Sequence, residues 1–210
     1  HVDAPTFEGP TLVLKNFLDR ASAAAGLVLL LPVFLGLALL IHSHDRGPVF
    51  FRQERVGRDG RTFKMLKFRT MHTEAEDALP ALMAASEGAG PLFKMKADPR
   101  VTAVGRVLRR YSLDELPQLI NVVRGEMSLV GPRPPLPREV LTYEADTRRR
   151  LLVKPGMTGM WQISGRSNLS WDESVRLDLY YVENWNPLLD LMILWRTVRV
   201  VTRPGEAGAY

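Results

Sequence analysis

The sequence predicts a compact α/β domain that is associated with a membrane and begins with a re-entrant helix-break-helix, followed by a small β-hairpin and several amphipathic helices. The membrane association is indicated by an uncharged apolar segment, Ala21–Ile41. The hairpin is indicated by two strand patterns, at 48–57 and 62–68, that flank the turn signal Asp59-Gly60. Helical patterns occupy most of the remaining length, and 210 residues suffice for one domain with a core.

The apolar segment is long enough to cross a bilayer, because its 21 residues carry no charge and about 20 suffice. Pro32, however, lies in its middle, where a proline removes a helix hydrogen bond and kinks the chain. Basic or titratable residues flank both ends: Lys15 and Arg20 before it, and His42, His44 and Arg46 after it. The positive-inside rule therefore gives no orientation. A kinked hairpin that enters and leaves on the cytoplasmic face fits both facts; a spanning helix and a buried core helix are the alternatives.

Further along the chain, helical patterns are expected at 73–86, 100–110, 112–124, 138–152, 171–185 and 187–202. Gly125 is expected to end the third of them. The run 131–137 holds four prolines and predicts a stiff, extended loop, and 154–164 predicts a loop and a strand. The last helix is apolar nearly all round, with arginines near its end. It is either a core helix or an interfacial helix whose Trp195 lies at headgroup depth.

The composition narrows the chemistry. Lysine and arginine number 28 against 23 acidic residues, which gives a net charge of +5 and suits an anionic partner such as a nucleotide, a phospholipid surface or a nucleic acid. The absence of cysteine excludes disulfides, zinc thiolates and thiol nucleophiles, and favours a cytoplasm-facing protein. The four histidines all lie early, which leaves no plausible base for a Ser-His-Asp triad, and no Walker A or G-x-G-x-x-G motif is present.

The most informative stretch is 112–119, which holds the adjacent acids Asp114 and Glu115. One interpretation is structural, because Ser112 and Glu115 have the spacing of a helix capping box. Pro117 speaks against it, since a proline in the fifth position of that helix loses a hydrogen bond. The other interpretation is catalytic: a carboxylate can attack phosphorus, and its neighbour can help hold a divalent ion that bridges diphosphate oxygens.

Basic residues of the chain could neutralise the charge that develops on phosphate oxygens. The candidates are Lys67, Arg69, Arg109, Arg110, Arg133 and Arg166. Any single basic side chain is more often simply solvated. Arg133 is the exception, because prolines on both sides preorganise its backbone and so reduce the entropy lost on binding an anion. Gly165-Arg166 is a weaker version of the same idea.

Several long motifs in a fixed order resemble those of the bacterial sugar transferases, which are monotopic polyprenyl-phosphate phosphoglycosyl transferases. They lie at 47–57, 67–71, 98–102, 112–119, 127–134, 154–162 and 180–185. The resemblance runs from about Lys15 to the C-terminus and is strongest with the WbaP-like subgroup. It implies three parts: a lead-in at 1–14, a re-entrant membrane helix at 15–46 and a catalytic domain at 47–210 on the cytoplasmic face of the bacterial inner membrane.

The resemblance also implies a mechanism and partners. The membrane helix is kinked at Leu31-Pro32. Asp114 and Glu115 form the catalytic dyad and the Mg²⁺ site, with Lys67, Arg109, Arg133 and Arg166 as anion-binding positions. Asp114 attacks the β-phosphate of a UDP-sugar and releases UMP, and undecaprenyl phosphate then takes the phosphosugar in a ping-pong reaction.

The resemblance places the reaction at the first membrane step of exopolysaccharide, capsule or O-antigen assembly. The subgroup typically transfers galactose-1-phosphate or glucose-1-phosphate, and its members usually carry further membrane helices before the catalytic part. The expected partners are a UDP-sugar, undecaprenyl phosphate and membrane lipids but no nucleic acid, and the apolar C-terminal helix could pair in a homodimer. Two other readings are a phosphohydrolase acting on a lipid diphosphate and a non-catalytic module that binds anionic lipid.

Overall fold

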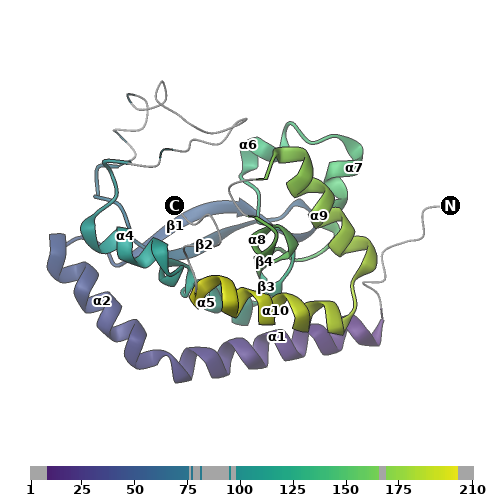
Figure 1. The fold of residues 1–210 in the computed structure, drawn as a ribbon, viewed down its shortest axis with the longest axis horizontal. Coiled ribbons are helices and arrows are strands. Elements are labelled where there is room, and N and C mark those ends of the chain that lie inside the picture. The colour runs from purple at the N-terminus through teal and green to yellow at the C-terminus, as the bar shows by residue number, and fades with distance from the viewer. Residues whose placement is uncertain are drawn as a thin grey trace.

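A bent pair of helices runs along one side of the molecule (Figure 1). The structure is a computed structural model that describes residues 9–75, 77, 81, 95, 98–165 and 169–202. Helix α1 spans Pro10–Leu29 and helix α2 spans Leu31–Asp45, and their axes are bent by 63°. In the described part of the chain, neither helix alone has the length and apolar composition to cross a membrane, whereas the bent pair together does, as a broken span or a re-entrant loop.

The bend lies where the sequence predicts it. Pro32 occupies the first turn of α2, a position where its missing N–H costs nothing because first-turn amides have no partner within the helix. The backbone hydrogen bonds stop and resume around it: Leu30 donates to the carbonyl of Gly26, and Phe34 donates to the carbonyl of Leu30. The first helix begins at Pro10, inside the segment expected as a lead-in.

The predicted hairpin is confirmed. Strands β1 (Phe50–Val56) and β2 (Thr62–Phe68) pair antiparallel, from Phe50 opposite Phe68 to Val56 opposite Thr62. A short 3₁₀ turn, η1 (Arg58–Gly60), joins them. Asp59 and Gly60 both have positive φ, which is what an Asp-Gly turn requires.

The expected single helix at 112–124 is wrong, and so is its capping box. Ser112 has φ 53° and caps nothing; it is followed by a 3₁₀ turn, η3 (Leu113–Glu115), and then by helix α5 (Gln118–Arg124). Pro117 explains the division, because it has no N–H for a helix that starts earlier and therefore precedes the first helical residue. Gly125 ends α5 with φ 80°, as predicted. Before this segment, helix α4 (Ala103–Arg110) is capped by the Thr102 hydroxyl.

A second, parallel sheet joins two motifs that are far apart in the sequence. Strand β3 (Ser128–Val130) pairs with β4 (Gly156–Thr158). The backbones come so close that a Cβ on Gly156 would lie 2.1 Å from the nitrogen of Gly131. The glycines at 131 and 156 are thus packing requirements of this crossing.

The remaining described helices follow along the chain as far as Thr202. The predicted helix at 138–152 is wrong: it is divided into α6 (Pro137–Val140), α7 (Ala145–Arg148) and η4 (Arg149–Leu152). The hydroxyl of Thr142 donates to the carbonyl of Glu139, which ends the first piece. Helices α8 (Met160–Ile163), α9 (Trp171–Asn184) and α10 (Pro187–Thr202) follow. The helix expected at 73–86 lies largely outside the described residues.

Three buried clusters hold the elements together. Helix α1 packs through Ala23 onto Leu119 and Met65, and α2 packs through Ile41 onto Phe68 and Leu108. The bent pair is therefore part of the fold and not an appendage. The third cluster joins β3, α9 and α10. Within α10, Ile193 is fully buried while Leu191 and Trp195 are exposed, so one face of this helix belongs to the core, and an interfacial position for the other face stays a prediction.

The N-terminal half of helix α1, residues 13–19, has its polar side chains toward the domain and its large apolar side chains toward the outside. Lys15 is buried and Asn16 and Asp19 are partly buried against the domain. On the same turns, the outward side chains are large, apolar and more than half exposed: Val13, Leu14, Phe17 and Leu18. This is the reverse of the pattern of a surface helix in a water-soluble domain.

Candidate active site

The two adjacent acids meet a lysine from the hairpin. Asp114 and Glu115 lie on η3, and Lys67 lies near the end of β2. The Lys67 ammonium is 2.7 Å from the carboxylate of Glu115 and 3.9 Å from that of Asp114. Asp114 is buried, with 8% of its surface exposed, whereas Glu115 is more open. The site thus has one sheltered carboxylate and one that reaches solvent.

The groups around Asp114 shift the pKa of its carboxyl in opposite directions. Burial raises the pKa of the Asp114 carboxyl above its ordinary value, and the neighbouring charge of Glu115 raises it further. Lys67 and Arg109 lower that pKa and so favour the ionised form. A buried carboxylate held between cations is an arrangement found at catalytic sites, where perturbed pKa values gather.

The two consecutive arginines of α4 point to different places. Arg109 is partly buried, donates from Nε to the hydroxyl of Thr70 at 2.9 Å, and acts electrostatically on Asp114. Burial lowers the pKa of Arg109, while the charge of Asp114 raises it. Arg110 is exposed, and its guanidinium lies 5.7 Å from the ring of Tyr111. The structure therefore brings Arg109, and not Arg110, toward the dyad.

Arg69 lies two residues after Lys67, just beyond the end of β2, but has another role in this structure. It is buried, and its Nε donates to the carbonyl of Pro48 at 2.6 Å. A Cβ on Gly47 would lie 2.9 Å from both terminal nitrogens of Arg69. Arg69 therefore fastens the link between α2 and β1, which holds the bent helix pair against the hairpin.

Arg133 is held in place by a buried acid. Its guanidinium donates to Glu139 at 2.8 Å, and the Glu139 side chain is completely buried. The ring of Trp161 lies 6.0 Å from the same guanidinium. The backbone N–H of Arg133 also donates to Asp178. The preorganisation predicted from the flanking prolines is thus reinforced by side chains. Arg166 lies outside the described residues.

Arg55 is a basic residue near the site that the sequence reasoning missed. It donates to the carbonyl of Pro134 at 2.8 Å. Burial, with Arg133 next, lowers its pKa to about 10, while Glu139 and Glu115 act in the opposite direction. Arg55 therefore interacts electrostatically with Glu115 of the dyad and with Arg133. Strand alternation could have found it, because Phe51 is paired with Lys67 and every second residue from there, including Arg55, shares that face.

The dyad fits a magnesium ion that is completed by a substrate. Among the described residues, no group of three or more His, Asp or Glu side chains could hold a metal. Mg²⁺ is commonly bound by one or two carboxylates together with substrate phosphates and water. Asp114 and Glu115 supply that number of carboxylates, and the nearby cations would bind the remaining phosphate charge.

Comparison with known proteins gives a consistent family. The family model described as bacterial sugar transferase matches residues 10–204. The chain is 45% identical over 201 residues to the UDP-galactose-lipid carrier transferase of Erwinia amylovora, covering 94% of this chain and 42% of that protein. It is 44% identical over 193 residues to the exopolysaccharide production protein ExoY of Sinorhizobium fredii, covering 90% of this chain and 85% of that protein.

A third relative is the undecaprenyl-phosphate galactose phosphotransferase of Salmonella typhimurium, which is 43% identical over 201 residues. That alignment covers 94% of this chain and 42% of the relative. The chain therefore spans about two fifths of the length of two of these three relatives and most of the third.

Proposed function

The chain belongs to the bacterial sugar transferases, and from this membership we propose that it transfers a hexose-1-phosphate from a UDP-sugar to undecaprenyl phosphate and releases UMP. The names of two relatives support these substrates: one is a UDP-galactose-lipid carrier transferase and the other an undecaprenyl-phosphate galactose phosphotransferase. The observation that carries the proposal is the buried Asp114, flanked by Lys67 and Arg109. Galactose or glucose is the proposed sugar, and assembly of an exopolysaccharide or capsule is the proposed pathway.

In the first half-reaction, a carboxylate oxygen of Asp114 attacks the β-phosphorus of the donor. The bond between that phosphorus and the oxygen bridging to the α-phosphate breaks, and UMP leaves with the bridging oxygen. Lys67 and Arg109 neutralise charge on the oxygens of the transferred phosphoryl group. Asp114 and Glu115 are the residues that would hold Mg²⁺, which when bound would neutralise charge on the diphosphate.

In the second half-reaction, a phosphate oxygen of undecaprenyl phosphate attacks the same phosphorus. The bond to Asp114 breaks, the carboxylate is restored, and the product is a lipid diphosphate sugar. One phosphate site serves both steps, because each substrate presents its phosphate to the same cations. Since one substrate is soluble and the other is a lipid, the site must lie at the membrane surface.

The proposed membrane placement is supported by the surface of the helices. The outward face of α1, much of α2 and one face of α10 expose large apolar side chains. We place the bend at Leu31-Pro32 within the bilayer and both outer ends of the pair at the cytoplasmic surface. This re-entrant arrangement accounts for a charged inner face on α1, because ionisable residues of membrane helices face the protein interior.

The test of the mechanism is the covalent intermediate. The full chain is incubated with Mg²⁺ and one UDP-sugar at a time, without lipid acceptor, and its intact mass is measured. We expect a hexose-phosphate adduct with the correct donor. In Asp114→Asn, an amide cannot act as the nucleophile, so the adduct is absent and UMP release falls by about 10⁴-fold or more.

Three controls make the result decisive. Chelation of Mg²⁺ should abolish adduct formation in the unaltered chain. Arg110→Gln, which removes an exposed charge from the same helix, should leave the adduct intact. Near-normal UMP release by Asp114→Asn would overturn the role of this residue, and release of free phosphate without UMP would indicate the phosphohydrolase instead.

A further inference from the structure

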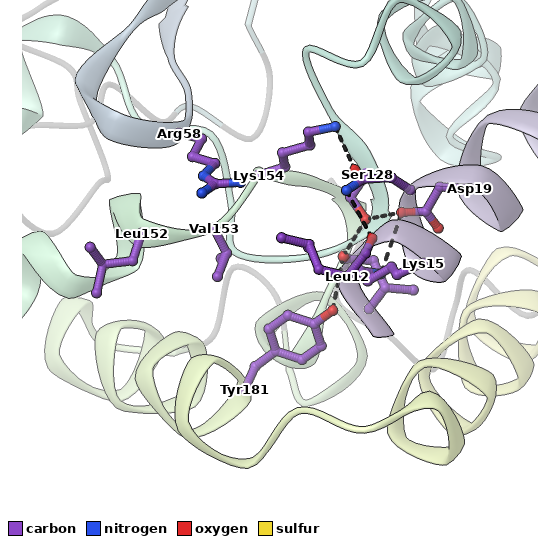
Figure 2. A pocket seen from close by; sticks show the side chains of 11 residues that line it. Leu12, Lys15, Asp19, Arg58, Ser128, Leu152, Val153, Lys154 and Tyr181 are labelled. Atoms are coloured by element: carbon purple, nitrogen blue, oxygen red, sulfur yellow. Dashed lines mark hydrogen bonds and ion pairs between the residues drawn. The ribbon is translucent and has the colours of Figure 1, made fainter. Parts of the chain in front are cut away.

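A second basic site lies at the opposite end of the hairpin from the dyad. A small cleft, partly open to solvent, is formed by α1, η1, β3 and the segment around η4 (Figure 2). Its lining includes three cationic side chains, from Lys15, Arg58 and Lys154. Arg58 belongs to the hairpin turn, and Lys67 lies near the other end of β2. At about 3.3 Å per residue, this separation is roughly 20 Å, so the cleft is distinct from the dyad.

The positive charges of the cleft act on one another. Burial lowers the pKa of Lys154, and the charges of Arg20, Arg58 and Lys15 lower it further, with Asp19 opposing them. The ammonium of Lys154 donates to the side-chain oxygen of Asn16 at 2.6 Å, which is a neutral partner. A lysine that is held among other cations by a neutral amide is suited to an anion that enters from outside.

The acidic residues nearby are already engaged on the inner side. Lys15 is 2.6 Å from Asp190 and 3.4 Å from Asp19. Asp19 accepts a hydrogen bond from the hydroxyl of Ser128, and Asp190 accepts others from Tyr181 and Trp185. Figure 2 shows the contacts of Lys15, Asp19 and Ser128 gathered at the α1 side, with Arg58 at the opposite end of the cleft. Arg58 forms an ion pair with its neighbour Asp59 at 3.4 Å, but both side chains are exposed and such surface pairs contribute little. Among the described residues, Lys154 has no ion-pair partner, so Lys154 and Arg58 are the cations open to a ligand.

The cleft also lies beside an apolar surface. The turns of α1 that contribute Lys15 and Asp19 expose Phe17 and Leu18 on their other side, one helix diameter of about 10 Å away. Leu152, which lines the cleft, has 44% of its surface exposed. Cations next to exposed apolar side chains match a ligand that has a phosphate at one end and a hydrocarbon chain at the other.

We propose that this cleft binds the phosphate of an anionic membrane lipid, with Lys154 and Arg58 as the anion-binding residues and Leu152 in contact with the apolar part. The inference rests on the membrane placement proposed above and adds a lipid site that is separate from the reaction. The bound lipid would hold the N-terminal end of α1 at the headgroup level, while the dyad lies toward the end of α2. The phosphate could come from a bilayer phospholipid or from the polyprenyl phosphate carrier.

Native mass spectrometry of the full chain in detergent tests the site. Phosphatidylglycerol, phosphatidylcholine or undecaprenyl phosphate is added separately, and the fraction of protein with one bound lipid is measured. We expect phosphatidylglycerol to be retained and phosphatidylcholine, which has no net charge, to be lost. A lysine or arginine near a lipid surface contributes about 1 kcal/mol, which is about fivefold in affinity. The double variant Arg58→Gln/Lys154→Gln should therefore bind phosphatidylglycerol about 20-fold more weakly.

A matched double variant removes the same charge elsewhere on the hairpin. Arg52 and Arg61 are exposed, so Arg52→Gln/Arg61→Gln should lose little lipid binding. Arg58→Gln alone, at an exposed residue, provides a variant in which the contact between Lys154 and Asn16 is kept; it should lose about fivefold. Equal losses in the two double variants, or equal retention of both phospholipids, would overturn the site.

The same measurements distinguish the two possible lipids. They also distinguish failure of the lipid site from failure of the proposed transferase reaction. If Asp114→Asn retains undecaprenyl phosphate but no phospholipid, and Arg58→Gln/Lys154→Gln loses undecaprenyl phosphate, then the lipid bound in the cleft is the carrier. The hexose-phosphate adduct should form normally in Arg58→Gln/Lys154→Gln, which shows that the fold and the dyad are intact. Failure of the lipid site leaves that adduct in place, whereas failure of the proposed reaction removes it from the unaltered chain without changing lipid retention.

Discussion

Asp114 combines two properties that oppose each other, because it is buried and must be ionised to attack phosphorus. Its cations resolve the conflict only in part, since the pKa of the carboxyl is still raised. The adjacency of two acids and the preceding arginines was visible in the sequence. Helix geometry alone did not identify the arginine that reaches the dyad, because Arg109 and Arg110 differ by about 100° around α4. The family resemblance did single out Arg109.

The raised pKa makes a prediction about stability. In the folded state Asp114 binds a proton more tightly than in the unfolded state, so stability falls as pH rises from about 3.9, the ordinary value, through the folded value. Asp114→Asn removes this loss and should raise the free energy of unfolding at pH 7 by about 1 kcal/mol or more, which lies within the usual range for one substitution. The gain should vanish near pH 3, where both forms are neutral. Urea denaturation at the two pH values measures it, and an equal effect at both would contradict the explanation.

Lys67 should set the acid limit of activity. It lowers the pKa of Asp114 and holds Glu115 at 2.7 Å. Lys67→Gln removes that charge, so the carboxyl of Asp114 should ionise at higher pH. The acid limb of kcat/KM for UMP release should then shift upward in pH, in addition to a lower maximum. A lower maximum with an unshifted limb would mean that Lys67 only binds phosphate.

At the scale of elements, the longest and most periodic segments were predictable and the shortest were not. The last helix and the returning strand have the bounds expected from their patterns. Helices at 112–124 and 138–152 were wrong because local hydrogen bonding and Pro117 end turns that their composition would continue. The pairing of β3 with β4 could not be predicted, because each strand has only three residues and the partners are 28 positions apart.

The bend in the helix pair depends on one missing hydrogen-bond donor. In Pro32→Ala, the new N–H could bond the carbonyl of residue 28 and join α1 to α2, because alanine is about 3 kcal/mol more favourable than proline inside a helix. We expect the N-terminal arm to cross the bilayer. The chain has no cysteine, so His1→Cys provides a single label site, and its accessibility from the cytoplasmic side should be lost.

Two comparisons complete that experiment. Arg61→Cys on the hairpin should remain accessible in both backgrounds, which reports intact vesicles. Pro10→Ala changes a proline in the first turn of α1, where its missing N–H costs no helix hydrogen bond, and should leave the labelling pattern unchanged. A cytoplasmic position 1 in Pro32→Ala would show that packing, and not Pro32, maintains the bend.

At the scale of the whole molecule, large apolar side chains are exposed on the bent helix pair and on α10, whereas those of the three core clusters are buried. Both the bent pair and α10 carry exposed leucines, while the proposed catalytic residues that the structure describes come from the hairpin, α4 and η3. The compact α/β character and the bent pair were predictable from composition and periodicity. Contacts such as Arg133 with Glu139 were not, since they depend on how distant segments fold together. The homodimer through the last helix stays a prediction.

The exposed apolar surface should control how the protein leaves a membrane. At about 1 M salt the Debye length is about 3 Å, so attachment through the net positive charge alone would be lost. We expect the protein to remain with the membrane fraction in such a wash and to be released by detergent. Quantitative immunoblotting of both fractions measures this. Release by salt alone would contradict a helix pair that enters the bilayer.

The ion pair between Lys15 and Asp190 sets an order for biosynthesis. The two residues are 175 positions apart. At 5 to 20 residues per second, a ribosome needs roughly 10 to 35 s to make the second after the first. During that interval the nascent α1 has an apolar outer face and Asp19 beside its inner lysine, but it lacks Asp190, the closer of the two acids that contact Lys15. The final packing of α1 against the domain must therefore await the synthesis of Asp190.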